Sequence, residues 1–277
     1  MPNARGDGWL TVLHTPDMDP ELLAAAAAGL RDAERTRVPI AALTATYPEL
    51  AVKDAYEIQL INIRQRLEDG GIIRGHKVGL TAKVMQEMLG VDEPDYGHLV
   101  EDMFFSSKAD VRADRFLQPR VEVEIAFRLQ SPLVGPGITI DDVLAATEVV
   151  APSIEIIDSR IADWKITLAD TIADNASSAG VVIGPWLPLA NTLHLDAVSV
   201  DLVKNGGVVA SGTGADVMGH PAAAVAWLAN KLSALEITLD AGHVVMPGSC
   251  TKAIAVTAGD HIRAEFSELG DVSVVFT

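Results

Sequence analysis

Apolar and polar positions divide the chain into a helical beginning and a β-rich remainder. Residues 19–35 open with Asp-Pro-Glu, which supplies an N-cap, a first-turn proline and an acidic first turn for a helix. From about residue 52, apolar side chains recur at helical spacing until Gly70 and Gly71 end the pattern. We therefore expect an N-terminal helical segment over residues 1–70 and a β-rich domain over residues 71–277.

Short runs rich in β-branched residues dominate the chain after residue 71. Few helices separate these runs, so the pattern favours an α+β fold over a doubly wound parallel sheet. Helices are expected after Thr81, near residues 140–147 and from His220-Pro221 to Leu235. The predicted strands cover residues 72–78, 121–129, 149–157, 181–183, 198–204, 243–246, 253–256, 261–266 and 272–276.

One strand alternates strictly and places two carboxylates on the same face. In residues 120–127 the apolar side chains fall on one side, and Glu122 and Glu124 fall on the other. Such a pair is tolerated on a solvent-facing strand or around a hard divalent cation. From the spacing alone, the solvent-facing strand is favoured.

A third acid, Glu155, lies in a strand whose neighbours are almost all apolar. A carboxylate in such a place is costly unless it is paired or bound to a metal. Carboxylate ligands without histidine or cysteine favour Mg²⁺ or Mn²⁺, and three ligands leave coordination positions open for substrate. This pattern indicates a catalytic metal site.

Two further residues are candidates for catalysis. Lys77 lies where a strand passes through Gly79 into a predicted helix, so it either faces a ligand or is a surface lysine on an edge strand. Asp95 lies in a turn-like stretch, residues 93–99, where a turn former is favoured over a general base.

Polar residues elsewhere could contact a substrate. Arg160 and Lys165 are candidate cations for an acidic substrate, although either could pair with a nearby aspartate instead. Ser177 could orient a ligand or satisfy a loop backbone, and Ser249 either lines a pocket or belongs to a plain β-turn.

Composition narrows the classes of partner and compartment. The 277 residues carry 21 Lys and Arg against 38 Asp and Glu, a net charge of −17, which disfavours nucleic acids and anionic membranes. The single cysteine, Cys250, excludes an intramolecular disulfide. No signal peptide or membrane span is evident, so we expect a cytoplasmic protein. Nucleotide-binding and serine-hydrolase motifs are missing, and the seven histidines lack the spacing of a zinc site.

Four segments in chain order resemble the 2-oxopent-4-enoate hydratase group of the fumarylacetoacetate hydrolase superfamily. The likeness runs from about residue 35 to the C-terminus, whereas the first eighteen residues match no part of the pattern. A departure is His76, where members more often carry Arg or Lys. The segments are residues 75–81, 93–97, 118–124 and 156–178.

The resemblance implies a β-rich fold around Mg²⁺ or Mn²⁺, a homo-oligomer, association with a pathway neighbour enzyme, and a role in meta-cleavage degradation of aromatic compounds. It assigns the metal to Glu122, Glu124 and Glu155, and catalysis to Lys77 and Asp95. The substrate would be a 2-hydroxy-2,4-dienoate, hydrated to a 4-hydroxy-2-oxo acid with Asp95 deprotonating the water.

Two other functions remain open. The 4-oxalocrotonate decarboxylases share the superfamily fold, but their turn is generally apolar where this chain has Asp95, which favours the hydratase. A catalytically inactive partner subunit is a hypothesis of a different class, and the complete set of candidate residues argues against it.

Overall fold

The computed structural model describes residues 17–83, 86–87, 91–190 and 192–277 of the chain. Within them, no helix has the length and apolar character needed to cross a membrane. The first eighteen residues of the sequence therefore lie almost wholly outside the described residues. So does most of the helix expected after Thr81, of which only residues 83, 86 and 87 are described, all helical.

Helices account for the beginning of the chain, as the periodicity predicts. Asp19 caps the first helix by accepting a hydrogen bond from the Glu21 amide (2.8 Å), and Arg37 ends it in a left-handed conformation. The helices are α1 (Pro20–Thr36), α2 (Leu43–Thr46), α3 (Val52–Glu68), α5 (Ile140–Ala146), α6 (Leu168–Ala173) and α7 (Pro221–Ser233).

The remaining elements form two sheets. In the described residues, the larger sheet has the order β2-β1-β11-β5-β6-β7-β3, with β12 joined to β5 and β8 to β6, and the smaller has the order β10-β9-β13-β14-β4. Residues 93–99 are interpreted from sequence as a turn, but residues 95–100 form a strand. The strands are β1 (Ile73–Gly79), β2 (Asp95–Val100), β3 (Phe104–Ser106), β4 (Ala109–Val111), β5 (Arg120–Leu129), β6 (Thr147–Ile157), β7 (Ser178–Ile183), β8 (Leu187–Pro188), β9 (Ser199–Lys204), β10 (Gly207–Thr213), β11 (Val244–Met246), β12 (Ile254–Ala255), β13 (His261–Phe266) and β14 (Gly270–Phe276).

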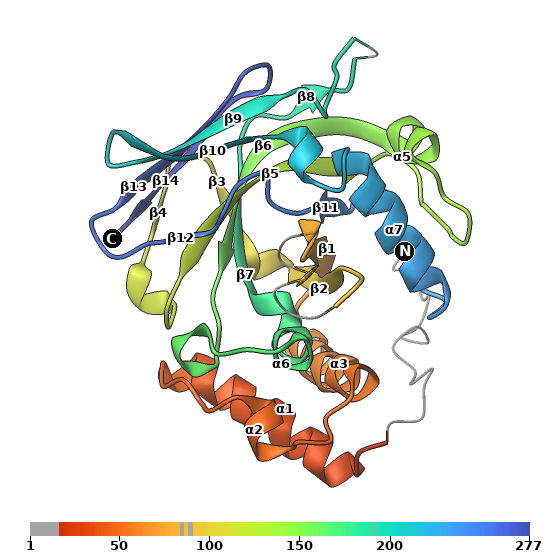
Figure 1. The fold of residues 1–277 in the computed structure, drawn as a ribbon, viewed down its shortest axis with the longest axis vertical. Coiled ribbons are helices and arrows are strands. Elements are labelled where there is room, and N and C mark those ends of the chain that lie inside the picture. Colours follow the sequence, from red (N-terminus) through yellow and green to blue (C-terminus); the bar gives the residue numbers. More distant parts are fainter. Residues whose placement is uncertain (1–16, 84–85, 88–90, 191) are drawn as a thin grey trace.

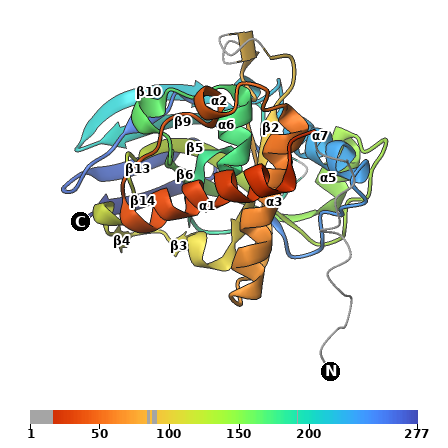
Figure 2. The same ribbon diagram turned by 90° about the horizontal axis from the view of Figure 1, so that it is seen from below.

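Helices α1 to α3 lie at one end of the molecule, and the smaller sheet lies at the other (Figure 1). Viewed from below, α1 crosses the helical end with α3 beside it (Figure 2). An apolar cluster joins these helices to α6 through residues such as Leu23, Ile58 and Ile172. The end of α3 at Glu68 matches the expected boundary at residue 70, but whether residues 1–70 form a unit of their own stays a prediction.

Candidate active site

Three glutamates meet where β5 pairs with β6 in the interior of the larger sheet. Glu122 stands directly opposite Glu155 in the antiparallel register, and Glu124 is two residues further along the same face. One carboxylate oxygen from each lies within 4.8 Å of the others. Glu124 and Glu155 are 0% exposed, so the solvent-facing interpretation of this strand is wrong.

The chemistry of this cluster fits a hard divalent cation. Glu124 Oε1 and Glu155 Oε2 are buried and have no hydrogen-bond partner among the described residues. Burial raises the pKa of Glu122 to about 7 and also raises the pKa values of Glu124 and Glu155, and repulsion from Glu155 adds to the first two shifts. A divalent cation would favour the ionised forms and accept the unused oxygens as ligands.

Two neighbouring groups donate hydrogen bonds to carboxylate oxygens of this cluster. The Gly248 amide donates to Glu124 Oε2 (2.8 Å), and Ser178 Oγ donates to Glu155 Oε1 (3.0 Å). Gly248 has a φ of +111°, which favours glycine. Both residues flank sequence candidates, Ser249 and Ser177, but the supporting contacts depend on tertiary structure that no local pattern reveals.

Lys77 lies on β1, between β2 and β11, and is 3% exposed. Its Nζ donates to the Ala176 carbonyl (3.0 Å) and lies 3.5 Å from Glu155 Oε2. Although burial opposes the charged form, the surrounding carboxylates, Glu155 foremost, hold the pKa of Lys77 above its usual range. The alternative of a surface lysine on an edge strand is therefore wrong.

Asp95 is the first residue of β2 and is 2% exposed, so its side chain is not that of a solvent-exposed turn former. Its Oδ2 accepts a long hydrogen bond from Thr171 Oγ1 (3.4 Å), and its Oδ1 has no partner among the described residues. Gly79 stands opposite in the register, where any Cβ would collide with Oδ1. Burial raises the pKa of Asp95, as suits a group that accepts a proton.

A left-handed turn lies beside these residues. Asn175, Ala176 and Ser177 all have φ values between +50° and +54°, a conformation that is costly for residues with a Cβ. The Asn175 side chain holds the turn to β2 by accepting from the His98 amide (2.8 Å) and donating to its carbonyl (2.9 Å). The turn thereby presents the Ala176 carbonyl to Lys77.

A cavity of about 220 Å³ opens next to Glu122, Lys77 and Asp95. Ser177 lines it, as does Thr171, which sequence reasoning did not single out. Two other residues of the lining were also overlooked, Arg120 and Trp164. Apolar side chains supply much of the remaining wall, namely Leu80, Ile157, Ile166, Ala176 and Ala253.

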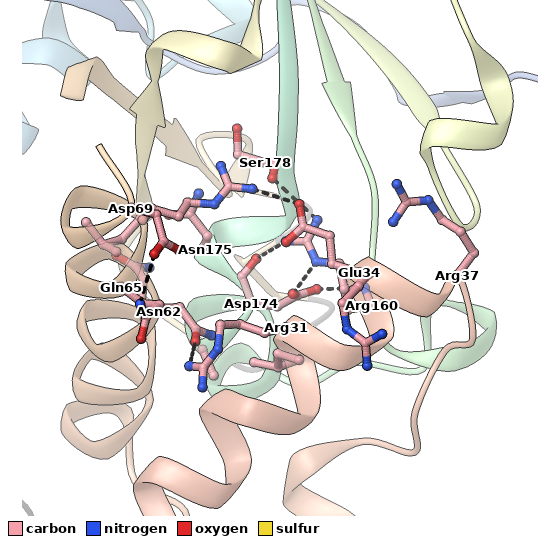
Figure 3. Close-up of a pocket in the computed structure, with 16 residues that line it drawn as sticks. Arg31, Glu34, Arg37, Asn62, Gln65, Asp69, Arg160, Asp174, Asn175 and Ser178 are labelled. Atoms are coloured by element: carbon pink, nitrogen blue, oxygen red, sulfur yellow. Dashed lines mark hydrogen bonds and ion pairs between the residues drawn. The ribbon is translucent and has the colours of Figure 1, made fainter. Parts of the chain in front are cut away.

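The structure does not bring three predicted substrate-binding residues into this cavity. Arg160 is ion-paired with Asp174 (2.5 Å) and lines a second cavity of about 340 Å³ on the helical side of the turn (Figure 3). Lys165 is exposed and paired with Asp163 (3.0 Å). Both Arg160 and Lys165 are therefore ion-paired with nearby aspartates. Ser249 is half-buried, and its Oγ donates weakly to the Val123 carbonyl (3.4 Å).

The profile of the family described as fumarylacetoacetate (FAA) hydrolase C-terminal matches residues 76–276. The chain belongs to the fumarylacetoacetate hydrolase family. The matched range contains the three glutamates, Lys77 and Asp95, whereas α1 to α3 precede it.

Relatives within this family include hydratases and a decarboxylase. A 2-hydroxyhexa-2,4-dienoate hydratase of Comamonas testosteroni is 46% identical over 250 residues, which cover 90% of this chain and 95% of the relative. A 2-oxo-hept-4-ene-1,7-dioate hydratase of Escherichia coli is 40% identical over 253 residues, which cover 89% and 95%. The solved 4-oxalocrotonate decarboxylase from Pseudomonas putida G7, complexed with magnesium and adipate, has a TM-score of 0.92 at 35% identity and covers 95% of this chain and 100% of its own.

Proposed function

We propose that this chain is a metal-dependent hydratase that adds water to a 2-hydroxy-2,4-dienoate and releases a 4-hydroxy-2-oxo acid, as a step in meta-cleavage degradation of aromatic compounds. The observation that carries the proposal is the unpartnered carboxylate oxygen of Asp95 in the cavity beside the three glutamates. The hydratase relatives at 46% and 40% identity support the same reaction.

Glu122, Glu124 and Glu155 would hold Mg²⁺ or Mn²⁺. When bound, the cation supplies Lewis-acid stabilisation of negative charge that develops on the 2-oxygen of the substrate. Lys77 would offset the charge of Glu155, and its hydrogen bond to the Ala176 carbonyl orients the ammonium group beside the three glutamates.

Asp95 would accept a proton from the water that adds to the substrate. Its unpartnered Oδ1 is available to a water molecule in the cavity, while Thr171 contacts the other oxygen. Burial raises the pKa of Asp95, which makes the carboxylate a stronger base than one in bulk water.

Decarboxylation of a 2-oxo-3-enedioate is the second candidate, because the solved decarboxylase superposes with a TM-score of 0.92. That reaction breaks a carbon–carbon bond and releases CO₂, and it deprotonates no attacking water. A buried base at position 95 has no evident task in it, so the hydratase is favoured.

The Asp95→Asn variant tests the choice. With Mg²⁺ and fresh 2-hydroxypenta-2,4-dienoate, we expect wild-type protein to remove the ultraviolet absorbance of the dienoate, and Asp95→Asn to lower kcat by about 10²- to 10⁴-fold. EDTA should abolish turnover by the wild type. The matched control is Asp141→Asn, an exposed aspartate on α5, which should retain wild-type kcat.

The competing functions give different results in the same assay. CO₂ release from 2-oxohex-3-enedioate without hydration of the dienoate, and with Asp95→Asn unaffected, would identify a decarboxylase. No turnover of either substrate would favour the inactive partner subunit.

We also propose that the chain forms a homo-oligomer. Strand β10 lies at an end of the smaller sheet, and Val208 and Val209 on it are exposed, which is a surface that tends to pair with another chain. Light scattering on purified protein should give a multiple of 29.3 kDa, and a Val208→Lys variant should reduce it. A monomer at micromolar concentration would contradict this.

Association with a pathway neighbour enzyme is proposed from family resemblance and is testable by co-purification.

A further inference from the structure

The Arg120 guanidinium lines the cavity and is not ion-paired with any described residue, although its charge lowers the pKa of Glu122. Arg120 begins β5 and lies two residues before Glu122 on the same face of the strand. Its guanidinium carbon lies 4.4 Å from the centre of the Trp164 ring. No hydrogen bond or ion pair to another described residue engages it, although the side chain lines the cavity.

The Trp164 ring is itself held in place. Its Nε1 donates to the Gln118 carbonyl (3.0 Å), which ties the ring to the segment that leads into β5. A guanidinium stacked on a fixed aromatic ring loses conformational freedom before any ligand binds and keeps its N–H groups available at the edge of the stack. Arg120 is therefore already ordered for binding an anion.

Other cations near the cavity are already engaged. Lys77, the second cation in the lining, is bound to the Ala176 carbonyl and lies beside Glu155. Arg160 is paired with Asp174 outside the cavity, and Lys165 is paired with Asp163 at the surface.

We infer that Arg120 binds the carboxylate that every acid of the proposed substrate class carries, with Trp164 as its platform. The inference rests on the proposed function. Four carboxylates lie in or beside the cavity, those of Asp95 and the three glutamates, so an acidic substrate needs a cation that these groups do not already use.

The same placement orients the substrate. Arg120 enters the cavity from β5 and Asp95 from β2, two strands separated in the sheet by β11 and β1. A carboxylate is attracted to Arg120 and repelled by Asp95, so its hydrocarbon part extends from the guanidinium towards the base. Ile157 stands opposite Arg120 in the register and supplies apolar surface for the carbons.

The test measures binding of two non-reacting acids, 2-oxohexanoate and 2-oxoadipate, to Mg²⁺-loaded protein by calorimetry. The two acids have carbon chains of the same length, and only 2-oxoadipate carries a second carboxylate at the distal end. We expect Arg120→Met to weaken both by the same factor, about ten- to a hundredfold, and Arg120→Lys to recover part of the loss. Loss confined to 2-oxoadipate would assign Arg120 to the distal carboxylate, and no loss for either acid would make it a structural residue; both results overturn the inference.

A matched control lies on the same strand. Arg128 stacks on Trp186 at 4.9 Å in the same manner, but it pairs with Glu148 and lies outside the substrate cavity. Arg128→Met should leave both affinities unchanged, and thermal unfolding should confirm that each variant is folded. Because binding is measured without turnover, failure of the hydratase assay would overturn the proposed reaction and still leave the role of Arg120 decided by these affinities.

Discussion

Several side chains in this site, each considered alone, lower the stability of the folded protein. Glu124 and Glu155 bring carboxylate oxygens with no hydrogen-bond partner into a buried position, and Asp95 does the same close by. Groups of this kind lower the free energy of unfolding, and they persist where function requires them. The cost and the proposed metal binding are therefore two consequences of the same three glutamates.

Glu124→Gln separates those two consequences. At pH 8 the variant removes one of three repelling charges while its amide oxygen still accepts from Gly248, so metal-free protein should gain about 1 kcal/mol and a Tm higher by roughly 2–4 °C. Its affinity for Mg²⁺ should fall at least tenfold. Calorimetric titration and thermal unfolding measure both effects.

The control for this pair of effects is Glu148→Gln, an exposed residue on β6 that pairs with Arg128. It should change neither the Tm nor Mg²⁺ binding appreciably. If Glu124→Gln bound Mg²⁺ as tightly as the wild type, the three-glutamate site would be the wrong assignment.

At the scale of elements, the left-handed turn at residues 175–177 links β2 to Lys77, the lysine proposed to act in the reaction. Asn175 hydrogen-bonds β2, and Ala176 accepts from Lys77. Gly97 on β2 faces this turn so closely that a Cβ there would collide with the Asn175 carbonyl oxygen. The strand and the turn therefore depend on each other.

Gly97→Ala should disturb both. Overpacking against the turn should cost about 2 kcal/mol and lower the Tm by roughly 4–8 °C, and kcat should fall because the Ala176 carbonyl moves relative to Lys77. Gly207→Ala on β10 serves as the comparison, since the nearest atom to its Cβ would be the Lys204 oxygen at 3.8 Å. Equal Tm and kcat for the two variants would rule out the proposed link.

The strands of the site differ in how far sequence predicts them. β5 and β6 follow from alternation and β-branched residues, and the metal-binding role proposed for Glu155 follows from its apolar neighbours. β2 does not, because residues 93–99 have the composition of a turn, and residues 95–100 become a strand only through pairing with β1 and contact with Asn175. Helix α6, six residues long, likewise depends on packing against α3.

The sequence does not show which cationic side chains face the cavity and which form ion pairs elsewhere. Arg160 and Lys165 stood out because aspartates and polar residues surround them, yet those same aspartates are their partners in the fold. Arg120 is the first residue of a strand, which does not mark it as a binding residue in the sequence. Its position over Trp164 in the cavity distinguishes it from the other cations. Partner choice is a property of tertiary structure that spacing alone does not encode.

On the scale of the whole molecule, a cluster of three histidines, on β1, on β2 and directly before β11, makes stability depend on pH. The His76 ring lies 5.0 Å from that of His98 and 5.7 Å from that of His243. Burial lowers the pKa of His98 to about 4 and also lowers those of His76 and His243, with further lowering of His76 by its two neighbours. The folded protein therefore keeps the His98 ring neutral in mild acid.

We expect unfolding free energy to reflect this as the pH falls. Between about pH 6.5 and 4 the unfolded chain binds more protons at residue 98 than the folded chain does, so stability is lost on acidification, by about 2 kcal/mol at pH 5 relative to pH 7 from His98 alone. Urea unfolding at the two pH values should give a smaller loss for His98→Gln than for wild type.

Buried carboxylates with raised pKa values act in the opposite direction over this range, but they are common to both proteins and cancel in the comparison. His261→Gln, at an exposed position on β13, should behave as the wild type does. An acid-induced loss of equal size in His98→Gln would refute the assignment.

The pairing of Glu122 with Glu155 across β5 and β6 also bears on how the protein reaches its native state. A slip of one residue between these strands would put an apolar side chain in place of an acid, and the three carboxylates would no longer converge. Cation capture would thus select chains whose central strands are correctly aligned. Added Mg²⁺ should therefore raise the yield of correctly refolded protein, because it binds only chains in which the three glutamates converge.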